Sequence, residues 1–525
     1  MKKFYLLLTF FLIYLSSNAQ TFGNEWINYS QQHYSFSLTQ TGLFKIDAAS
    51  LSAAGIPINS FTAGNIQIFG RQKEIPLYIQ DGGDNQLDVG DVIFFYAEKN
   101  DGWLDSTLYD DPNRMGNPKF SLYNDTIQYF LTWNTSENNK RFVLENDVDF
   151  NAYSPSNYVF SEKWQAFSQA YIAGEKSSEA ASSFYVSGEG WGSSIQNGVN
   201  GYTWNFSSTL LENVYQGLDA PLVNYRAVTV GASNASFGGN GNHHSVHTIG
   251  ASNYVLHDTI FTGYQGIHIN KSFPVSILPA SGGTNYKVSI LGDQSALSDF
   301  QSLNYWSFLY PRYPSFLNAN KTSFLVENNS NQAKIRLNMS LLSLTNPYCF
   351  VLGDVPRKTP VVTVSPGNFQ VLIPNSASGN SQKVILQDAS TIVNIISFKL
   401  VNGTGVFTDF SSIPNLEKAL LFIYHPKIEN SVIDYATYRS SILGGDYNVI
   451  LSKTDELYQQ FGGGIPKHIN GIRRYAHYIY SLSTQKPVGL YLLGKGIREA
   501  SVTTALSSGP AEKLYRRTRR PPAQP

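Results

Sequence analysis

The sequence predicts a multidomain protein that is mainly β, with β-sandwich domains followed by the start of an α/β domain. Its 525 residues are enough for three or four domains of about 150 residues each. Aromatic residues make up 14% of the chain and charged residues another 14%, where about 25% charged is usual, and this composition favours strands. Near Leu416 the pattern changes from short strands to alternating strands and helices.

Charge and composition exclude several classes of protein. The 38 basic and 38 acidic residues give a net charge of zero, so nothing in the overall charge favours binding to nucleic acid or to an anionic membrane. An apolar content of 42% can form hydrophobic cores and excludes a disordered chain. Cys349 is the single cysteine, and an internal disulfide is therefore excluded.

Residues 1–19 have the pattern of a secretory signal peptide. Two lysines follow Met1, an apolar run covers Phe4 to Leu15, and small residues up to Ala19 suit cleavage before Gln20. The apolar run is too short to span a bilayer, and no second run approaches the length of about 18 residues that a transmembrane helix needs. The protein is therefore expected to be exported to the periplasm, the cell surface or the extracellular space.

Residues 20–150 are expected to form an N-terminal β domain, because short runs of β-branched and aromatic residues alternate there with turn residues. The expected strands are Ile66–Phe69, Ile75–Ile79, Val92–Tyr96 and Ile127–Trp133, with a helical turn at Leu51–Gly55.

Residues 151–415 continue this pattern and are expected to form a β-sandwich region. The expected strands are Tyr225–Gly231, Ser245–Ile249, Tyr254–Phe261, Tyr286–Leu291, Ile335–Leu342, Val361–Val364 and Ile395–Val401. Because every expected strand of this region lies before residue 416, residues 20–415 are predicted to fold without the rest of the chain.

Residues 416–505 are expected to form an incomplete α/β domain. The continuous apolar run Ala419–Tyr424 is typical of a strand buried on both faces, and Tyr447–Leu451 and Val488–Leu493 are the next strands. Between them, two helix faces are expected from apolar spacings of three and four residues. The first comprises Ile433, Ala436, Ser440 and Leu443, and the second Ile469, Ile472, Ala476 and Ile479. In such sheets, ligands bind beyond the carboxyl ends of the strands.

Residues 506–525 form a basic, proline-rich tail that is not expected to belong to the native fold. Four arginines lie within the last ten residues, namely Arg516, Arg517, Arg519 and Arg520. The tail comes after three strands and two helices of an α/β domain, so we expect the chain to be a fragment. A basic interaction tail is the alternative interpretation.

Two polar clusters are candidate metal sites. His243, His244 and His247 form the densest histidine group, for which a solvated strand start is the simpler interpretation and zinc the alternative. Asp81, Asp84, Asp88 and Asp91 lie in a glycine-rich stretch that suits a turn, with calcium as the alternative. The expected cofactor is none.

Three further motifs do not predict a catalytic or cofactor-binding site. Gly494-Lys495-Gly496 comes after an α/β strand but lacks the third glycine of a dinucleotide site and the phosphate-loop pattern. Cys349, in Asn-Pro-Tyr-Cys-Phe, is expected to be a buried thiol without reactivity. His425 is interpreted as a loop residue at the exit of a strand.

Several stretches, taken in order, resemble the gingipain-like cysteine peptidase family, and most closely its long members that act as the sortase of type IX secretion. The resemblance covers most of residues 20 to about 505. The stretches are Glu25–Ile27, Tyr34–Ile46, Ile68–Gly70, Glu74–Pro76, Asp88–Tyr96, Asn100–Gly102, Tyr129–Trp133, Ser187–Trp191, Tyr424–Pro426, Tyr438–Arg439, Leu457–Gly464 and Leu492–Gly494.

The resemblance implies a caspase-like α/β domain that hydrolyses peptide bonds through a cysteine and a histidine, with proteins or peptides as substrates and the outer-membrane secretion machinery as a partner. In the family both catalytic residues lie beyond the part that this chain contains. No catalytic, cofactor-binding or metal-binding residue is therefore assigned, and the chain itself is expected to be inactive. An exported β-sandwich protein that binds a partner or a surface without catalysis is the alternative function.

Overall fold

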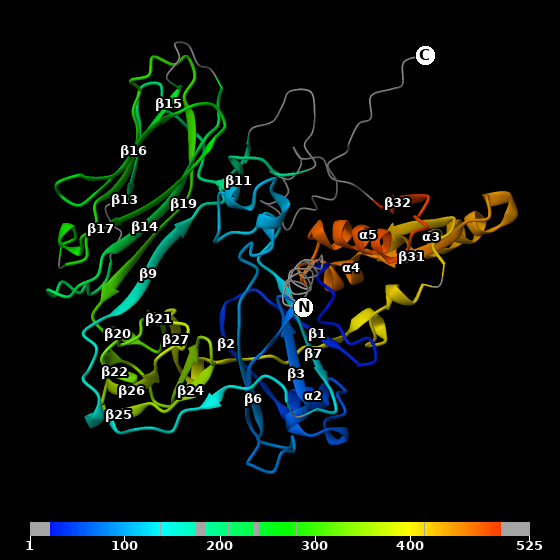
Figure 1. Cartoon of the computed structure of the whole chain (residues 1–525), viewed down its shortest axis with the longest axis horizontal. Helices are drawn as coiled ribbons and strands as arrows, with labels where there is room; N and C mark the ends of the chain where they lie inside the picture. The colour runs from blue at the N-terminus through cyan, green and yellow to red at the C-terminus, as the bar shows by residue number, and fades with distance from the viewer. Residues whose placement is uncertain are drawn as a thin grey trace, which may run out of the picture.

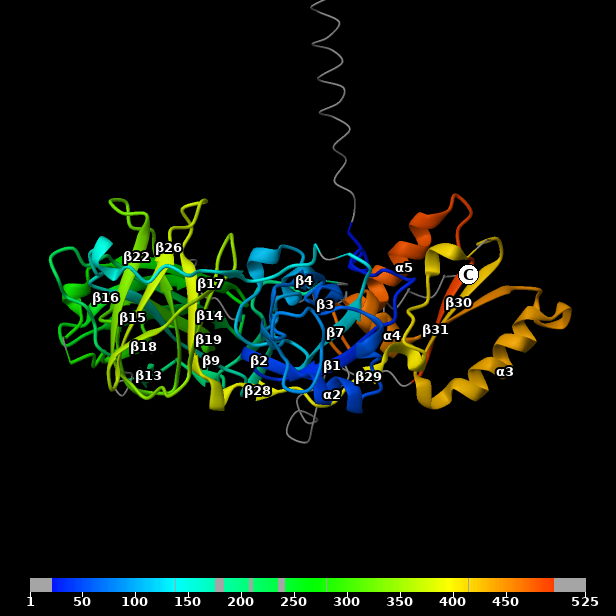
Figure 2. The ribbon, with the colours of Figure 1, turned by 90° about the horizontal axis from the view of Figure 1, so that it is seen from below.

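The structure is a computed structural model that describes residues 21–136, 138–174, 184–206, 211–234, 241–279, 281–413 and 415–494. The expected signal peptide and the basic tail lie outside the described residues. The described chain forms three bodies in a row, with an N-terminal sandwich in the middle, a larger β region on one side and an α/β unit on the other (Figures 1 and 2). None of the described helices is both long and apolar enough to cross a membrane.

The N-terminal sandwich packs two sheets around one core. The sheets have the strand orders β29-β1-β7-β3-β4 and β28-β2-β6-β5. Their strands are β1 (Tyr34–Leu38), β2 (Gly42–Asp47), β3 (Ile66–Gly70), β4 (Lys73–Ile75), β5 (Leu77–Gln80), β6 (Val92–Ala97), β7 (Ile127–Trp133), β28 (Val393–Asn394) and β29 (Lys399–Leu400). Helix α2 (Ala48–Ala53) begins where the Asp47 carboxylate accepts a hydrogen bond from the Ser50 N–H.

Two expected strands of this body differ from the structure. The run Ile75–Ile79 is divided at Pro76 into β4 and β5, because proline lacks the N–H that a ladder needs. The single strand expected at Ile395–Val401 is wrong, since only the short β29 forms within this range and β28 lies just before it. Each of the two pairs with a strand of the N-terminal sandwich. This sandwich therefore contains strands from both ends of the β region.

The larger β region is built on one long sheet of the order β17-β14-β19-β9-β21-β27-β23-β24-β8, to which β12 adds through β19. The strands are β8 (Val143–Leu144), β9 (Val159–Ala166), β12 (Gln196–Asn197), β14 (Val223–Gly231), β17 (Gly266–Phe273), β19 (Phe300–Arg312), β21 (Lys321–Val326), β23 (Pro347–Leu352), β24 (Arg357–Thr359) and β27 (Gln382–Asp388). Both halves of the sheet pack against a smaller sheet, which gives two sandwich cores.

The smaller sheets are antiparallel for the most part. One has the order β13-β18-β15-β16, the other β20-β22-β26-β25, and β10 pairs with β11 as a separate ribbon. The strands are β10 (Ala170–Ala173), β11 (Glu189–Gly192), β13 (Tyr202–Phe206), β15 (His243–Ile249), β16 (Tyr254–Phe261), β18 (Tyr286–Ile290), β20 (Ser315–Ala319), β22 (Lys334–Leu342), β25 (Val362–Ser365) and β26 (Asn368–Pro374).

The α/β unit has a parallel sheet of the order β31-β30-β32. Its strands are β30 (Ala419–Tyr424), β31 (Asn448–Lys453) and β32 (Gly489–Leu493), and its helices are α3 (Glu429–Ser440), α4 (Thr454–Gln460) and α5 (Asn470–Leu482). Helix α3 packs on one face of the sheet, and α4 and α5 pack on the other. This arrangement confirms the expected alternation of strands and helices.

The expected faces of the two longer helices need correction. In α3 the buried residues are Val432 and Ala436, whereas Ile433 is exposed, as is Leu443 in the 3-10 turn Ile442–Gly444 that follows the helix. The predicted face was wrong by one residue at Ile433, since the pair that faces the sheet is spaced by four. In α5 the buried apolar residues are Ile472, Tyr475 and Ile479. Helix α4, which had no counterpart among the expected elements, fills the space between β31 and α5.

Candidate functional site

The carboxyl edge of the parallel sheet carries one polar cluster. The Tyr424 hydroxyl donates to Glu429 Oε1 over 3.0 Å, and Lys453 Nζ lies 2.9 Å from the same oxygen. The hydrogen bond from Lys453, together with that from Tyr424, lowers the pKa of Glu429, while burial raises the pKa of Tyr424. The three residues come from β30, from the start of α3 and from β31, and they join these elements at the edge where ligands of α/β sheets bind.

His425 lies beside this cluster, at the exit of β30. The side-chain Nδ1 of His425 accepts a hydrogen bond from the Lys427 backbone N–H at 3.2 Å. The backbone N–H of His425 donates to the Leu493 carbonyl. The side chain therefore caps the short 3-10 turn Pro426–Ile428. A capping role agrees with the interpretation of His425 as a loop residue.

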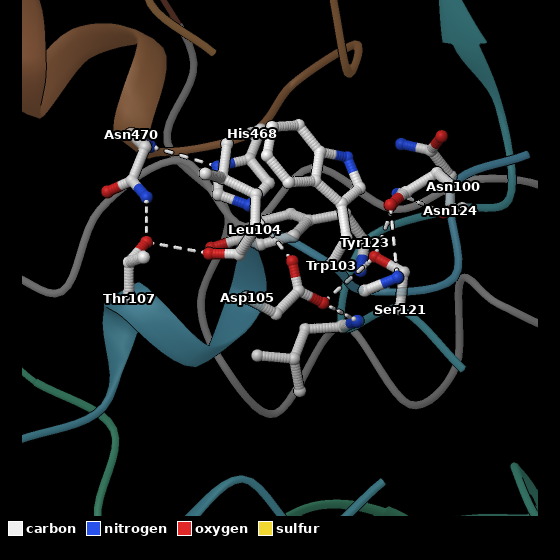
Figure 3. Close-up of polar contacts among 12 residues, drawn as sticks. Asn100, Trp103, Leu104, Asp105, Thr107, Ser121, Tyr123, Asn124, His468 and Asn470 are labelled. Carbon is white, nitrogen blue, oxygen red and sulfur yellow. Dashed lines mark hydrogen bonds and ion pairs between the residues drawn. The ribbon is translucent and has the colours of Figure 1, made fainter. Parts of the chain in front are cut away.

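A second polar cluster lies where the α/β unit meets the N-terminal sandwich (Figure 3). The junction loop, residues 461–469, connects α4 to α5. Its His468 donates from Nε2 to Asp105 Oδ1 over 2.9 Å, and both side chains are almost completely buried. Asp105 Oδ2 accepts two more hydrogen bonds, from the Ser121 hydroxyl at 3.0 Å and from the Leu122 N–H at 2.6 Å. Three donors thus converge on one buried carboxylate.

The geometry of His468 excludes a role for this pair in nucleophilic catalysis. Its Nδ1 accepts the backbone N–H of Asn470 at 3.2 Å, so the ring has no nitrogen left to take a proton from a nucleophile. Its ring contacts that of Tyr123, with ring centroids 4.7 Å apart and the ring planes tilted by 42°. The Asp105–His468 pair therefore connects two bodies of the protein.

Sequence reasoning did not identify this cluster. Asp105 and His468 are separated by 363 residues, and neither lies in a motif with the spacing of a known site. The available signal was the stretch Gly462-Gly463-Gly464, which comes after a helical segment and marks a place where the backbone approaches another part of the protein closely.

The structure separates the three histidines of the candidate zinc group. His243 is buried, with Nδ1 2.6 Å from Asp299 and Nε2 2.9 Å from the Gly263 carbonyl oxygen. His247 is buried in a sandwich core, with its two ring nitrogens 2.6 Å from the Tyr225 hydroxyl and 3.0 Å from the Thr229 hydroxyl. The simpler interpretation of a solvated strand start was wrong for both residues.

His244 points to the opposite face of the strand and bridges two carboxylates. Its Nδ1 lies 2.8 Å from Asp293 and its Nε2 lies 2.8 Å from Asp258. Burial alone would lower the pKa of His244, but the hydrogen bonds to Asp258 and Asp293 outweigh it and raise the pKa. Within the described residues, no three His, Cys, Asp or Glu side chains are grouped so that they could hold a metal ion.

The four aspartates of the candidate calcium loop form turns. Asp81 accepts from the Gly83 N–H, Asp84 from the Gln86 N–H, and Asp91 from the Asp88 N–H. These are the side-chain to backbone bonds that turns use. The charge of nearby Asp91 raises the pKa of the fully exposed Asp88.

Cys349 is buried in the middle of β23. Burial raises the pKa of its thiol from 9.0 to about 12, so the thiolate required for nucleophilic attack is not formed near neutral pH. Of the candidate nucleotide motif, Gly494 ends the described chain, and Lys495 and Gly496 lie outside the described residues.

Comparison with protein families gives a match that includes the α/β unit. Residues 413–509 match the model of Peptidase family C25. This match confirms the resemblance to the gingipain-like cysteine peptidases. A search of curated proteins found no match.

Among solved structures, the chain is similar to dimeric latent PorU from Porphyromonas gingivalis. The TM-score is 0.53 at 12% sequence identity, and the match covers 91% of this chain and 42% of the PorU chain. The chain thus spans less than half the length of that protein. At this identity the likeness concerns the fold alone, and it confirms the mainly β class followed by a caspase-like α/β start.

Two further matches have TM-scores too low to indicate a shared fold. Tandem CBM51 modules of a family 98 glycoside hydrolase from Streptococcus pneumoniae match with a TM-score of 0.18 at 7% identity, over 53% of this chain and 78% of that chain. The structure of infectious bursal disease virus, Gx strain, matches with a TM-score of 0.17 at 10% identity, over 68% of this chain and 78% of that chain.

Proposed function

We propose that this chain, with its Peptidase family C25 segment and its PorU-like fold, is part of an exported cysteine endopeptidase of gingipain type. The observation that carries the proposal is the coincidence of the family match with the parallel sheet. The match begins at residue 413, and the first strand of the sheet begins at Ala419. The two β bodies that precede this sheet in the chain would support the peptidase unit.

The proposed reaction is hydrolysis of a peptide bond through an acyl-enzyme. A histidine takes the proton of a cysteine thiol, the thiolate attacks the peptide carbonyl carbon, the amine leaves with that proton, and water then releases the acyl group. Because Cys349 is buried with a raised pKa, the catalytic cysteine would have to come from residues other than those described. Proteins or peptides would be the substrates.

We further propose that the peptidase serves type IX secretion as a sortase. The support is the PorU-like fold over 91% of this chain. The outer-membrane secretion machinery would then be the partner. Residues 1–19, with the pattern of a signal peptide, would direct export to the periplasm, the cell surface or the medium.

The first test is to read the coding sequence in all three frames beyond the codon for Ser508. Further α/β strands, with a histidine after one and a cysteine after the next, would support the peptidase. A stop codon in a well-determined sequence would favour an exported β-sandwich binding protein without catalysis.

The second test locates the reactive thiol in the protein translated from that whole reading frame. A peptidyl chloromethyl ketone is added and the labelled residue is found by mass spectrometry. We expect one labelled cysteine outside residues 21–494 and unchanged labelling in a Cys349→Ala control. Labelling of Cys349 itself, or peptide cleavage abolished by Cys349→Ala, would contradict the proposal.

A further inference from the structure

The junction loop joins two bodies whose only covalent connection in the described chain passes through residues 401–418. We infer that this loop couples the N-terminal sandwich to the parallel sheet, and that Asp105 positions helix α5 from across the junction. The inference does not depend on the proposed peptidase activity. It rests on the contacts that hold the loop, on the attachment of the loop to the start of α5, and on the contacts of α5 with the sheet.

The N-terminal sandwich holds the junction loop by its backbone and by its side chains. The Gln128 N–H donates to the Gly464 carbonyl over 2.8 Å, and the Asn124 side-chain amide donates to the Pro466 carbonyl over 2.9 Å. Ile465 is completely buried and belongs to the core cluster of the N-terminal sandwich. One residue of the α/β unit is therefore part of another body's core.

The loop backbone is suited to this close approach. Gly463 and Gly464 have positive φ, at 66° and 74°, which glycine adopts without strain because it lacks a Cβ, and Lys467 has a φ of 65°, which few residues with a side chain adopt. A Cβ on Gly463 would lie 2.8 Å from the Trp103 ring, and one on Gly464 would lie 2.5 Å from the Gln128 carbonyl oxygen. The sandwich thus contacts the loop too closely for any side chain at these two positions.

The path from Asp105 to the sheet consists of consecutive contacts. His468, paired with Asp105, accepts the N–H of Asn470, the first residue of α5. The Asn470 side chain donates to the Thr107 hydroxyl over 2.7 Å, which is a second bond from the same helix end to the sandwich. Figure 3 shows the two bonds of Asn470, one to His468 and one to Thr107.

Helix α5 transmits this position to the sheet through its buried face. Tyr475 accepts a hydrogen bond of 2.7 Å from the Ser452 hydroxyl, and both groups are buried. Ser452 lies one residue before the carboxyl end of β31, next to Lys453 of the polar cluster at the sheet edge. A change at Asp105 should therefore reach the edge at which an α/β enzyme binds its ligand.

The experiment measures backbone hydrogen–deuterium exchange in the chain from Gln20 to Pro525. The variants are Asp105→Asn, His468→Gln and the double substitution. The matched control is Asp258→Asn, His244→Gln and their double, because this pair has the same chemistry but Asp258 is largely exposed. Peptides covering residues 448–454 and 470–482 report on the end of β31 and on α5.

We expect each single variant at the junction to speed exchange in both peptides by at least about tenfold, and the double variant to add little to either single. Such non-additivity is the sign of two residues acting as one unit. The control pair should leave both peptides unchanged. Faster exchange confined to the residues around positions 105 and 468, or an additive double variant, would overturn the inference.

A milder variant keeps the test decisive if Asp105→Asn does not fold. Thr107→Val removes the acceptor of the Asn470 side chain and leaves the buried carboxylate with all its donors. We expect exchange in residues 470–482 to rise by at least about threefold. Unchanged exchange there, in a folded protein, would show that the sandwich does not position α5.

Discussion

Burial determines the chemistry of the single thiol. The Cys349 side chain is enclosed by the core between β23 and the sheet of β22 and β26, and its pKa is raised to about 12. A thiol in this state neither ionises at pH 8 nor meets a reagent dissolved in water.

We therefore predict that Cys349 in the folded chain does not react with a disulfide reagent at pH 8. The same amount of protein unfolded in urea should release one equivalent of coloured product per chain. Rapid stoichiometric reaction before denaturant is added would show that β23 opens readily. Cys349→Ala should cost about 1–2 kcal/mol of unfolding free energy, because it leaves a small cavity.

Buried histidines make the free energy of unfolding depend on pH. Burial lowers the pKa of His247 from 6.5 to about 3, and it lowers that of His33 to about 4. A histidine with a lowered pKa in the folded state is neutral there but takes up a proton in the unfolded chain. Its contribution to stability is complete above pH 6.5 and is lost as the pH falls towards the folded pKa.

The predicted slope is measurable by urea unfolding between pH 6 and pH 4. His247 alone should lower the unfolding free energy by about 1.4 kcal/mol per pH unit in this range. His247→Gln should reduce the slope by that amount. His244→Gln is the control, because the raised pKa of His244 places its effect at higher pH. An unchanged slope in His247→Gln would contradict the assignment.

At the scale of one element, the junction loop is limited by the space around its glycines. Gly464→Ala should destabilise the protein by at least about 2 kcal/mol, because its positive φ and the Gln128 carbonyl oxygen both oppose a Cβ. Gly42→Ala in β2 is the control, since a Cβ there meets no atom within 4 Å. Urea unfolding of both variants checks the prediction, and equal effects would contradict it.

Strand β32 is the second element considered at this scale, because it exposes an apolar edge. It pairs with β30 alone among the described strands, and the side chains of Leu490, Tyr491 and Leu492 are all more than a third exposed. An exposed apolar edge strand is an association site.

We predict that Leu492→Lys lowers concentration-dependent association of the chain in light scattering. Leu317→Lys is the control, because Leu317 is also exposed but lies on β20, far from the α/β unit in Figure 1. If both substitutions reduce association equally, general charge and not the edge of β32 is responsible.

At the scale of the whole molecule, the bodies are less independent than the strand pattern suggests. Residues 20–415 contain every described strand of the N-terminal sandwich, and on this basis the sequence predicts that they fold alone. In the structure, however, Ile465 completes the sandwich core and His468 pairs with the buried Asp105. A chain that ends at residue 415 lacks both partners and leaves a buried carboxylate with an empty space beside it.

We accordingly predict that residues 20–415 unfold at a lower urea concentration than the sandwich does in the full chain. Tryptophan fluorescence of Trp103, which lies beside Gly463, reports on the junction when the other tryptophans are replaced. In the full chain, protease should cut the junction loop no faster than the turns of the sandwich. Equal urea midpoints for the two chains would show that the junction contributes no stability.

The sequence predicted the elements better than their partners. A continuous apolar run identified β30 and the parallel sheet, because burial on both faces leaves a clear local pattern. Short runs rich in β-branched and aromatic residues identified β7 and β16. The expected face of α3 was wrong, since Ile433 and Val432 are adjacent apolar residues that helical spacing distinguishes poorly. The Asp105–His468 pair left no local signal, because its two residues meet only through the tertiary fold. The boundaries at residues 150 and 415 remain predictions.

The pairing of β28 and β29 with the first two strands has a consequence for the order of synthesis. Tyr34 meets Leu400, and Phe44 meets Val393, so the ribosome must add some 350 residues before these neighbours can meet. Contacts so distant in sequence form slowly, because a long loop must close before they can stabilise anything. The body that leaves the ribosome first is thus completed only after the whole of the larger β region has been made, and until then its open sheet edges are available to chaperones, to export factors and to other unfinished chains.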